Sequence, residues 1–445
     1  VSYRIVVIEI NPRTSRSSAL ASKATGFPIA LVSAMLASGL TLKDIPCGKY
    51  GTLDKYVPDG DYVVIKFARW AFEKFKGVED KLGTQMRAVG EVMSIGKTYK
   101  EAFQKAIRSL ETGRYGLGYA KDYINMSKDQ LLKMLITPSS DRHFIMYEAL
   151  RKGATIEEIY DLTKVKTYFI EQMKELVDEE EALAAKKGAL PADDALVAAK
   201  KHGFSDKYLS QILEVPEDDI RNRRIELGCE EAWEGVHVSG TEDSAYYYST
   251  YNAEDKNPVN TDKPKIMILG GGPNRIGQGI EFDYCCVHAA LALKKLGFET
   301  IIVNCNPETV STDYDTSDKL YFEPLTEEEV LNIIEKENSI ILENVKDFNI
   351  KQILECGQCF RWERIADTDY IIVAYRRVIE VIQEGSTVTI LNTNMKDFNE
   401  IWKQYFDLEV NYGEIKEELS KDELLRKSVE FGYGIRILNQ DPFEM

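Results

Sequence analysis

The start of the chain places acidic, amide and guanidinium side chains at a spacing that could serve a nucleotide and its metal ion. Glu9, Asn11 and Arg13 alternate along an apolar run, and Arg16 follows them. Side chains at i and i+2 lie on one face of a strand, so Glu9 and Asn11 would point the same way. Their oxygens suit Mg²⁺, and the arginines suit a phosphate or carboxylate. Taken alone, the pattern fits an ordinary strand end with surface polar residues better.

A second candidate is a glycine-rich loop at residues 270–279. It follows the apolar run Lys265–Leu269 and precedes an Ala/Leu-rich stretch that ends at Leu296. With the apolar run Thr300–Val303, this order predicts a strand, a glycine turn, a helix and a strand, which is a βαβ unit. Such a loop could hold a nucleotide pyrophosphate at the helix N-terminus, or it could be a tight turn that binds no nucleotide.

Cys356 and Cys359 form a CxxC pattern, which can indicate a redox or zinc site. A redox pair should open a helix, whereas this pair runs into a predicted strand, and a zinc site needs a second pair of ligands. The seven cysteines are odd in number and follow no disulfide spacing. They are typical of reduced thiols in a cytoplasm.

Composition excludes some classes of function. The 445 residues carry a net charge of −17, and this acidity argues against unassisted binding of nucleic acid. The stretch 24–42 has no charged residue and could pass for a signal sequence or membrane span. Because Gly26, Pro28 and Gly39 interrupt it and a predicted strand precedes it, we expect a buried helix instead.

Periodicity predicts the elements that position these residues. A buried strand is expected at 4–10, and Thr326–Lys336 should be a helix. From residue 339 the apolar pattern alternates, which predicts strands at 358–364, 370–383 and 387–391 with a hairpin turn at 383–386, and then helices at 395–406 and 421–431. Helical periods dominate the middle of the chain, at 127–135, 142–152, 155–162, 167–187, 192–201, 205–213 and 216–227.

Several separated motifs resemble the large subunit of carbamoyl-phosphate synthase. They include Ser15–Pro28, Tyr62–Lys66, Gln85–Gly96 and the run 264–322. The resemblance implies ATP and Mg²⁺ (or Mn²⁺ or K⁺) as cofactors, Glu9 and Asn11 as metal ligands, and Arg13 and Arg16 as carboxyphosphate contacts. It also implies that Gly277 and Gly279 line a carbamate tunnel, with Asn304, Asn306 and Thr309 at the pocket's edge.

The end of the chain resembles a different family. The segments 352–362, 405–408 and 434–442 are similar to the N-terminal domain of 8-oxoguanine DNA glycosylases. The resemblance implies that the backbone carbonyl of Gly357 reads the damaged base. The catalytic Lys and Asp of that family have no counterpart in the chain, because they belong to a domain expected beyond Met445.

Together these resemblances predict a multidomain protein with α/β and all-α parts. The expected domains are an ATP-grasp remnant at 1–112, a helical oligomerisation domain at 113–260, a partial Rossmann-like pre-ATP-grasp unit at 261–337 and an α+β antiparallel-sheet domain at 338–445. We expect a chimera of a synthase fragment, from arginine and pyrimidine biosynthesis, with a base-excision-repair domain. It should be cytoplasmic, inactive alone and without strongly bound cofactor.

The implied partners are a glutaminase small subunit and further copies of the chain, with no membrane. Damaged DNA is a weaker candidate partner for residues 338–445. The alternative function is therefore an 8-oxoguanine recognition module that lacks its catalytic domain, and a third possibility is a folded but inert interaction protein.

Overall fold

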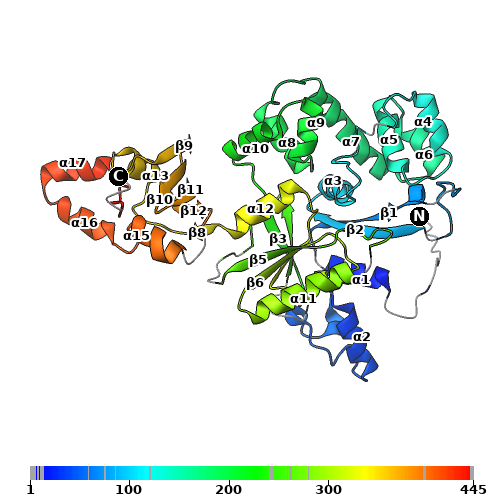
Figure 1. The fold of residues 1–445 in the computed structure, drawn as a ribbon, viewed down its shortest axis with the longest axis horizontal. Coiled ribbons are helices and arrows are strands. Elements are labelled where there is room, and N and C mark those ends of the chain that lie inside the picture. The colour runs from blue at the N-terminus through cyan, green and yellow to red at the C-terminus, as the bar shows by residue number, and fades with distance from the viewer. Residues whose placement is uncertain are drawn as a thin grey trace. The chain divides into compact units, whose positions relative to one another are not determined.

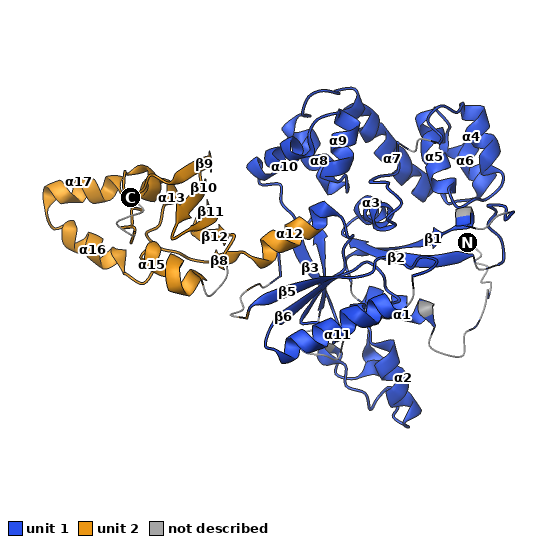
Figure 2. Cartoon of the chain, viewed as in Figure 1, with its two compact units in different colours: residues 1–257, 264–329 blue, residues 258–263, 330–445 orange. Residues whose placement is uncertain are grey.

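The chain folds into two compact units that both mix helices with sheets. The computed structural model describes residues 7, 10, 15–58, 60–74, 77–85, 87–119, 122–239, 245–257, 259, 263–278, 280–393 and 397–440. Unit 1 comprises residues 1–257 and 264–329, and unit 2 comprises residues 258–263 and 330–445 (Figure 2). The division falls inside α12 (Glu327–Glu337).

Unit 1 begins with short helices and an antiparallel strand pair. Thr98 caps the helix that covers this pair, and nine of its eleven residues are buried, so it forms the centre of the unit. The elements are α1 (Arg16–Thr25), α2 (Ile29–Ala37), η1 (Gly48–Tyr50), η2 (Leu53–Lys55), β1 (Val63–Trp70), η3 (Phe72–Lys74), β2 (Ala88–Gly96) and α3 (Tyr99–Ser109).

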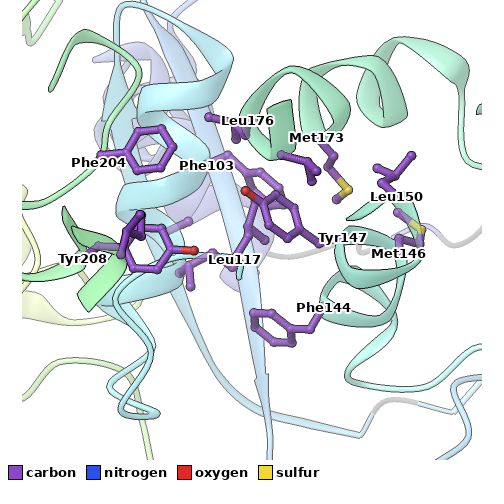
Figure 3. Close-up of a cluster of buried hydrophobic side chains, with 14 of the residues drawn as sticks. Phe103, Leu117, Phe144, Met146, Tyr147, Leu150, Met173, Leu176, Phe204 and Tyr208 are labelled. Carbon is purple, nitrogen blue, oxygen red and sulfur yellow. The ribbon is translucent and has the colours of Figure 1, made fainter. Parts of the chain in front are cut away.

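Seven helices follow, and each lies where the periodicity predicts it. α6 starts with a capping box, because the Thr155 hydroxyl accepts from the backbone N–H of Glu158 and the Glu158 side chain accepts from the backbone N–H of Thr155. Their apolar faces and α3 share one core around Phe103, Tyr147 and Tyr208 (Figure 3). The helices are α4 (Lys128–Leu135), α5 (Arg142–Arg151), α6 (Ile156–Thr163), α7 (Thr167–Ala184), α8 (Asp193–Lys201), α9 (Asp206–Leu213) and α10 (Glu217–Glu226).

The rest of unit 1 is a mixed five-stranded sheet in the order β3-β4-β7-β6-β5 (Figure 1). Strands β4, β7, β6 and β5 are parallel neighbours, as the predicted βαβ unit requires, and β3 pairs antiparallel with β4. The elements are β3 (Ala232–His237), β4 (Ala245–Thr250), β5 (Lys265–Leu269), α11 (Glu281–Lys295), β6 (Glu299–Val303), η4 (Val310–Thr312) and β7 (Lys319–Tyr321).

Buried ion pairs join parts of unit 1 that lie far apart in sequence. Lys105 Nζ lies 2.8 Å from Glu323, and Lys200 Nζ lies 2.7 Å from both Asp206 and Glu328. Arg224 donates to the second oxygen of Asp206 at 2.7 Å. These contacts connect α3, the helical region and the segment that leads into α12.

Unit 2 is an antiparallel sheet in the order β8-β12-β11-β10-β9, packed against short helices. Trp402, Tyr405 and Phe406 fill its core together with Ile353 and Ile379. The elements after α12 are β8 (Ile340–Leu342), α13 (Ile350–Glu355), β9 (Trp362–Ala366), β10 (Asp369–Ala374), β11 (Arg377–Glu384), β12 (Thr387–Leu391), η5 (Phe398–Trp402, a π-helical turn), α15 (Lys403–Tyr405), α16 (Tyr412–Leu419) and α17 (Glu423–Phe431).

Two predictions near the N-terminus need correction. Of the strand expected at 4–10, only Val7 and Ile10 are described, and both are exposed and outside any strand. A helix is present within 24–42, but its expected burial and extent are wrong. α1 ends at Thr25 with Gly26 as a left-handed cap, and α2 begins after Pro28. Only Val32 of α2 is buried.

The bent pair of α1 and α2 bears on the membrane question. Among the residues that the structure describes, no single helix is long and apolar enough to span a membrane. The pair Ser17–Thr25 and Ile29–Ala37, bent by 111°, passes the same test only when the two helices are taken together.

The C-terminal predictions are right in type and wrong in several boundaries. The strand expected at 370–383 is two strands, because Tyr375 and Arg376 both have positive φ and turn the chain back. The strand expected from 358 begins only at Trp362, and the hairpin turn before Thr387 is confirmed. Helices α13 and α16 were not predicted, and residues 395 and 396 of the expected 395–406 helix lie outside the described part of the chain.

Candidate functional site

The glycine loop leaves the end of β5 and passes against the segment that follows β6. Gly270 donates its backbone N–H to Val303 at 2.8 Å, and Gly272 donates to the side-chain oxygen of Asn304 at 3.2 Å. A Cβ at position 270 would lie 2.4 Å from the side chain of Asn304. The close approach of these two segments therefore requires glycine at 270.

Asn306 and Thr309 complete the polar surface beside the loop. The Asn306 side-chain amide donates to Gly272 O at 3.0 Å and to the Asn274 side chain at 3.1 Å. Asn304 donates to the Thr309 hydroxyl at 3.3 Å. The structure thus brings together the three residues predicted to shape the edge of a pocket, and they hold the loop in place.

The opposite side of the loop contacts β2 and the end of α3. A Cβ at Gly90 would lie 2.5 Å from the carbonyl oxygen of Asn274. Gly272 has a φ of +63°, and a Cβ there would lie 2.2 Å from a carboxylate oxygen of Glu111. Arg275 forms an ion pair with Glu111. The loop is clamped on both sides, and glycine permits both contacts.

Lys23 is a residue of this region that the sequence did not single out. Its ammonium is buried, donates to the carbonyls of Pro307 and Thr309 at 2.9 and 2.8 Å, and lies 3.0 Å from Asp313. Burial lowers the pKa of Lys23, and the nearby Asp313 opposes that shift. No local pattern could have identified it, because its partners lie more than 280 residues away.

The N-terminus of α11 is poorly suited to a phosphate. Glu281 and Asp283 lie in its first turn, where their negative charges would repel an anion. Asp283 already accepts from the backbone N–H groups of Val310 and Ser311, at 2.8 and 3.2 Å. In the described part of the chain, no three His, Cys, Asp or Glu side chains are grouped so that they could hold a metal ion. This geometry favours a structural turn over a pyrophosphate site.

Of the two glycines predicted to line a tunnel, the structure describes only Gly277. Gly277 has a φ of +86°, and no atom lies within 4 Å of where its Cβ would be, so open space surrounds it. Gly279 lies outside the described residues.

The predicted metal and carboxyphosphate residues cannot be located. Glu9, Asn11 and Arg13 lie outside the described residues, and so does the side chain of Arg16. Arg16 is the first residue of α1, which Ser15 starts through a capping box with Ser18. These assignments stay predictions.

A cavity of about 810 Å³ lies elsewhere in unit 1. Its wall includes the rings of Tyr50, Tyr56, Tyr62 and His237, beside the buried Cys47. None of its lining residues belongs to the glycine loop. The cavity is therefore distinct from the sites that the sequence predicts.

In unit 2, the predicted base-reading residue Gly357 lies just after α13. Its φ is +91°, and no atom lies within 4 Å of a Cβ built there. Gln358 anchors the next position by donating to Arg436 O and accepting from Leu438 N, both at 2.8 Å. Cys359 is buried against Tyr405, with its sulfur 3.5 Å from the tyrosine hydroxyl. The loop is firmly held on its inner side, and Gly357 is exposed.

The CxxC pair forms no joint site in this arrangement. Cys356 ends α13 and is exposed, whereas Cys359 is buried in the core. All seven cysteines of the chain are free thiols.

Models of known families match four segments of the chain. Residues 1–45 match the ATP binding domain of the carbamoyl-phosphate synthase L chain, residues 91–228 match the oligomerisation domain of the carbamoyl-phosphate synthetase large chain, and residues 262–345 match the carbamoyl phosphate synthase preATP-grasp domain. Residues 340–445 match the N-terminal domain of 8-oxoguanine DNA glycosylase. These matches define a composite of a ligase chain and a DNA-repair domain.

Individual relatives agree with these matches. The carbamoyl phosphate synthase large chain of Nostoc sp. is 52% identical over 344 residues, which are 76% of this chain and 31% of that one. The arginine-specific large chain of Arabidopsis thaliana is 50% identical over 350 residues, 77% of this chain and 29% of that one. The Clostridium acetobutylicum 8-oxoguanine glycosylase/lyase in its apo-form is 55% identical, covers 25% of this chain and 39% of that one, and has a TM-score of 0.24.

The chain therefore belongs to the carbamoyl-phosphate synthase large-chain family, and its last part, residues 340–445, matches the N-terminal domain of 8-oxoguanine DNA glycosylase. It spans about a third of the length of the curated synthase relatives.

Proposed function

We propose that residues 1–337 are the central part of a carbamoyl-phosphate synthase large chain and that this polypeptide does not make carbamoyl phosphate by itself. In the complete enzyme, Glu9 and Asn11 would be the ligands of the Mg²⁺ of ATP, and Arg13 and Arg16 would contact carboxyphosphate. In this polypeptide we expect them to bind Mg²⁺ only weakly. The glycine loop is a structural turn beside the carbamate tunnel, and a glutaminase subunit would supply ammonia.

One observation carries this proposal. The pre-ATP-grasp match ends at 345, and the glycosylase match begins at 340. The strand at this junction, β8, pairs antiparallel with β12, so it belongs to the glycosylase sheet. A synthase half needs an ATP-binding domain directly after its pre-ATP-grasp unit, because phosphoryl transfer depends on a nucleotide held with its metal ions. Here a different domain occupies that place.

The test is ATP hydrolysis by the purified 445-residue polypeptide in the presence of bicarbonate and Mg²⁺. We expect no hydrolysis above background, and the same result with ammonia added. Hydrolysis that is lost in Glu9→Ala and kept in the exposed control Glu79→Ala would overturn the proposal, because it would show a working site.

We also propose that the helical region self-associates. The helical domain expected at 113–260 shares its core with α3 and with Phe67 of β1, so the fragment to test is residues 60–260, which contains both. The fragment lacks α11, so its behaviour reports on the helical surface alone. We expect sedimentation to give a mass that rises with protein concentration, and a strict monomer at high concentration would contradict this.

A second candidate function is supported by the geometry around Gly357. A carbonyl that reads a base must be reachable, and Gly357 combines an anchored loop with open space above it. The domain has more acidic than basic residues, so we expect weak binding. Fluorescence anisotropy should show a small preference for an 8-oxoguanine duplex over a guanine duplex at low salt.

The matched variants for this second candidate are Gly357→Ala and the exposed control Gly385→Ala. Both positions have positive φ and open space, so both substitutions carry similar backbone strain. Loss of the preference in both variants, or in neither, would count against a base contact at Gly357.

A further inference from the structure

Helix α11 has an uncharged outer face on an otherwise strongly acidic protein. Between Tyr284 and Leu293 it contains no Asp, Glu, Lys or Arg. Its outward positions include Phe282, Tyr284 and Leu291, which are 53%, 60% and 41% exposed, and only Ala290 is buried. A helix that is apolar on all sides is normally covered. Figure 1 shows α11 along the outside of the β5–β6 part of its sheet.

The two ends of α11 carry opposite charges. Glu281 lies in the first turn and Lys295 at the last position, and both are exposed. Their neighbours are engaged within the chain, since Asp283 accepts from Val310 and Lys294 lies 3.5 Å from Asp318. Glu281 and Lys295 are thus the two charges that frame the apolar face.

We propose that α11 pairs antiparallel with α11 of a second copy of this chain around a twofold axis. Only an antiparallel pair places each Glu281 beside the Lys295 of the other copy, and a twofold forms both contacts at once. A parallel pair would place like charges together. A nucleic acid or an anionic membrane is a poor partner for this face, because Glu281 and the net charge of −17 would repel it.

The same register matches large side chains with small ones. When Glu281 faces Lys295 of the other copy, Tyr284 lies opposite Ala292, and Leu291 lies opposite Cys285. His288, whose ring packs 4.0 Å from that of Tyr284, lies next to the axis. Alternation of large and small residues lets two helices approach closely.

The adjacent strand is also consistent with a twofold. β5 ends the sheet, and no described strand pairs with its outer edge. Its last residue, Leu269, is 49% exposed and contacts α11 through the Cys286 thiol, 3.8 Å from Leu269 O. An unprotected edge favours pairing with another chain, and two identical edges can pair antiparallel.

The first test is the mass of the full chain by sedimentation and light scattering. Leu291→Asp should abolish this contact and halve the mass, because a carboxylate would be buried at the interface. Leu291 is already exposed, so the variant should fold, and circular dichroism checks this. An unchanged mass in folded Leu291→Asp would overturn the proposal. Any association seen in that case would be attributed to the helical region instead of α11.

The second test uses charge reversal. Glu281→Lys and Lys295→Glu should each weaken the dimer about tenfold, because each creates two like-charge contacts. Mixing the two variants should restore association as a heterodimer, and the double variant should restore the homodimer. The matched control is Glu417→Lys on α16, which should have no effect. Failure of the mixture to associate better than either variant alone would overturn the antiparallel register.

Discussion

Each unit contains a five-stranded sheet, and the two sheets are stabilised by different means. In unit 1 the strands run in the order β3-β4-β7-β6-β5, mostly parallel, and the sheet depends on helices that join its strands. In unit 2 the strands β9 to β12 follow one another as hairpins. Parallel strands need long crossovers and cover on both faces, whereas hairpins close locally.

This difference explains why apolar surface is left exposed on the sheet of unit 1, whereas the sheet of unit 2 has a core of its own. The antiparallel sheet has its own core around Trp402 and Ile379, with each hairpin supplied by neighbouring residues. The parallel sheet ends at β5, and α11 beside it leaves apolar side chains exposed. Among the described residues, the outer edge of β5 and the apolar side chains on the outer face of α11 are therefore the exposed parts of this sheet.

The comparison is tested most strongly by removing a buried charge from unit 1. Lys200→Met removes the ammonium between Asp206 and Glu328, so both buried carboxylates lose their lysine partner. We expect a loss of about 3–5 kcal/mol in the stability of unit 1, with unit 2 unaffected. Scanning calorimetry of the full chain should show the shift in one transition only. The control Lys187→Met breaks an exposed pair with Glu214 and should leave both transitions nearly unchanged.

A cavity in unit 2 should have the converse effect. Ile379→Ala empties a fully buried position in β11, and we expect a loss of about 2–4 kcal/mol confined to unit 2. Ile415→Ala, at a largely exposed position of α16, is the control and should cost much less. Equal shifts of both transitions in calorimetry would show that the units unfold as one and would invalidate the comparison.

The third prediction concerns acid sensitivity of unit 1. Burial alone would raise the pKa of Glu234, but hydrogen bonds from Lys256, Lys97 and Tyr248 outweigh it and lower the pKa to about 2. A depressed carboxylate pKa stabilises the fold above the unfolded pKa of about 4.5, and this stability is lost as the pH falls towards 2.

Glu234→Gln should therefore lose about 2 kcal/mol at pH 7 and show a flatter decline between pH 4.5 and 2. Urea unfolding at several pH values measures this, with the exposed Glu157→Gln as the control. A decline as steep as in the unchanged protein would exclude Glu234 as its source.

The smallest expected effect is a gain in the stability of unit 2. Arg376 has a φ of +58° in the tight turn between β10 and β11, where glycine is favoured. Arg376→Gly should stabilise unit 2 by about 0.5–1 kcal/mol. Arg377→Gly, one position further in the strand, should destabilise it. Thermal unfolding of both variants would show whether local turn geometry limits the stability of the antiparallel sheet.

Much of the local structure could be predicted, because its signals lie within a few residues. The seven helices between 127 and 227 follow the 3.6-residue period. β5 precedes the glycine loop and β6 follows α11, as predicted. The turn at Tyr375 and Arg376 was missed because neither residue is typical of a turn with positive φ.

The candidate sites were predicted only as far as their motifs extend. Asn304, Asn306 and Thr309 follow one strand closely enough in sequence that their meeting with the loop could be expected. The predicted metal ligands stay untested, since they lie outside the described residues. Lys23 and the Arg275–Glu111 pair have no local signature, because each connects segments more than 160 residues apart.

The sequence by itself determined the two parent families, the order of the elements and the residue types at each motif, since these are written in short patterns. The tertiary structure alone decided which distant charges are buried together, such as Lys105 with Glu323 and Lys200 with Glu328. It also decided that α2 and α11 keep apolar faces exposed, although their composition predicts burial. The physical reason is that burial depends on what packs against a helix, and residues far away in the chain provide that cover.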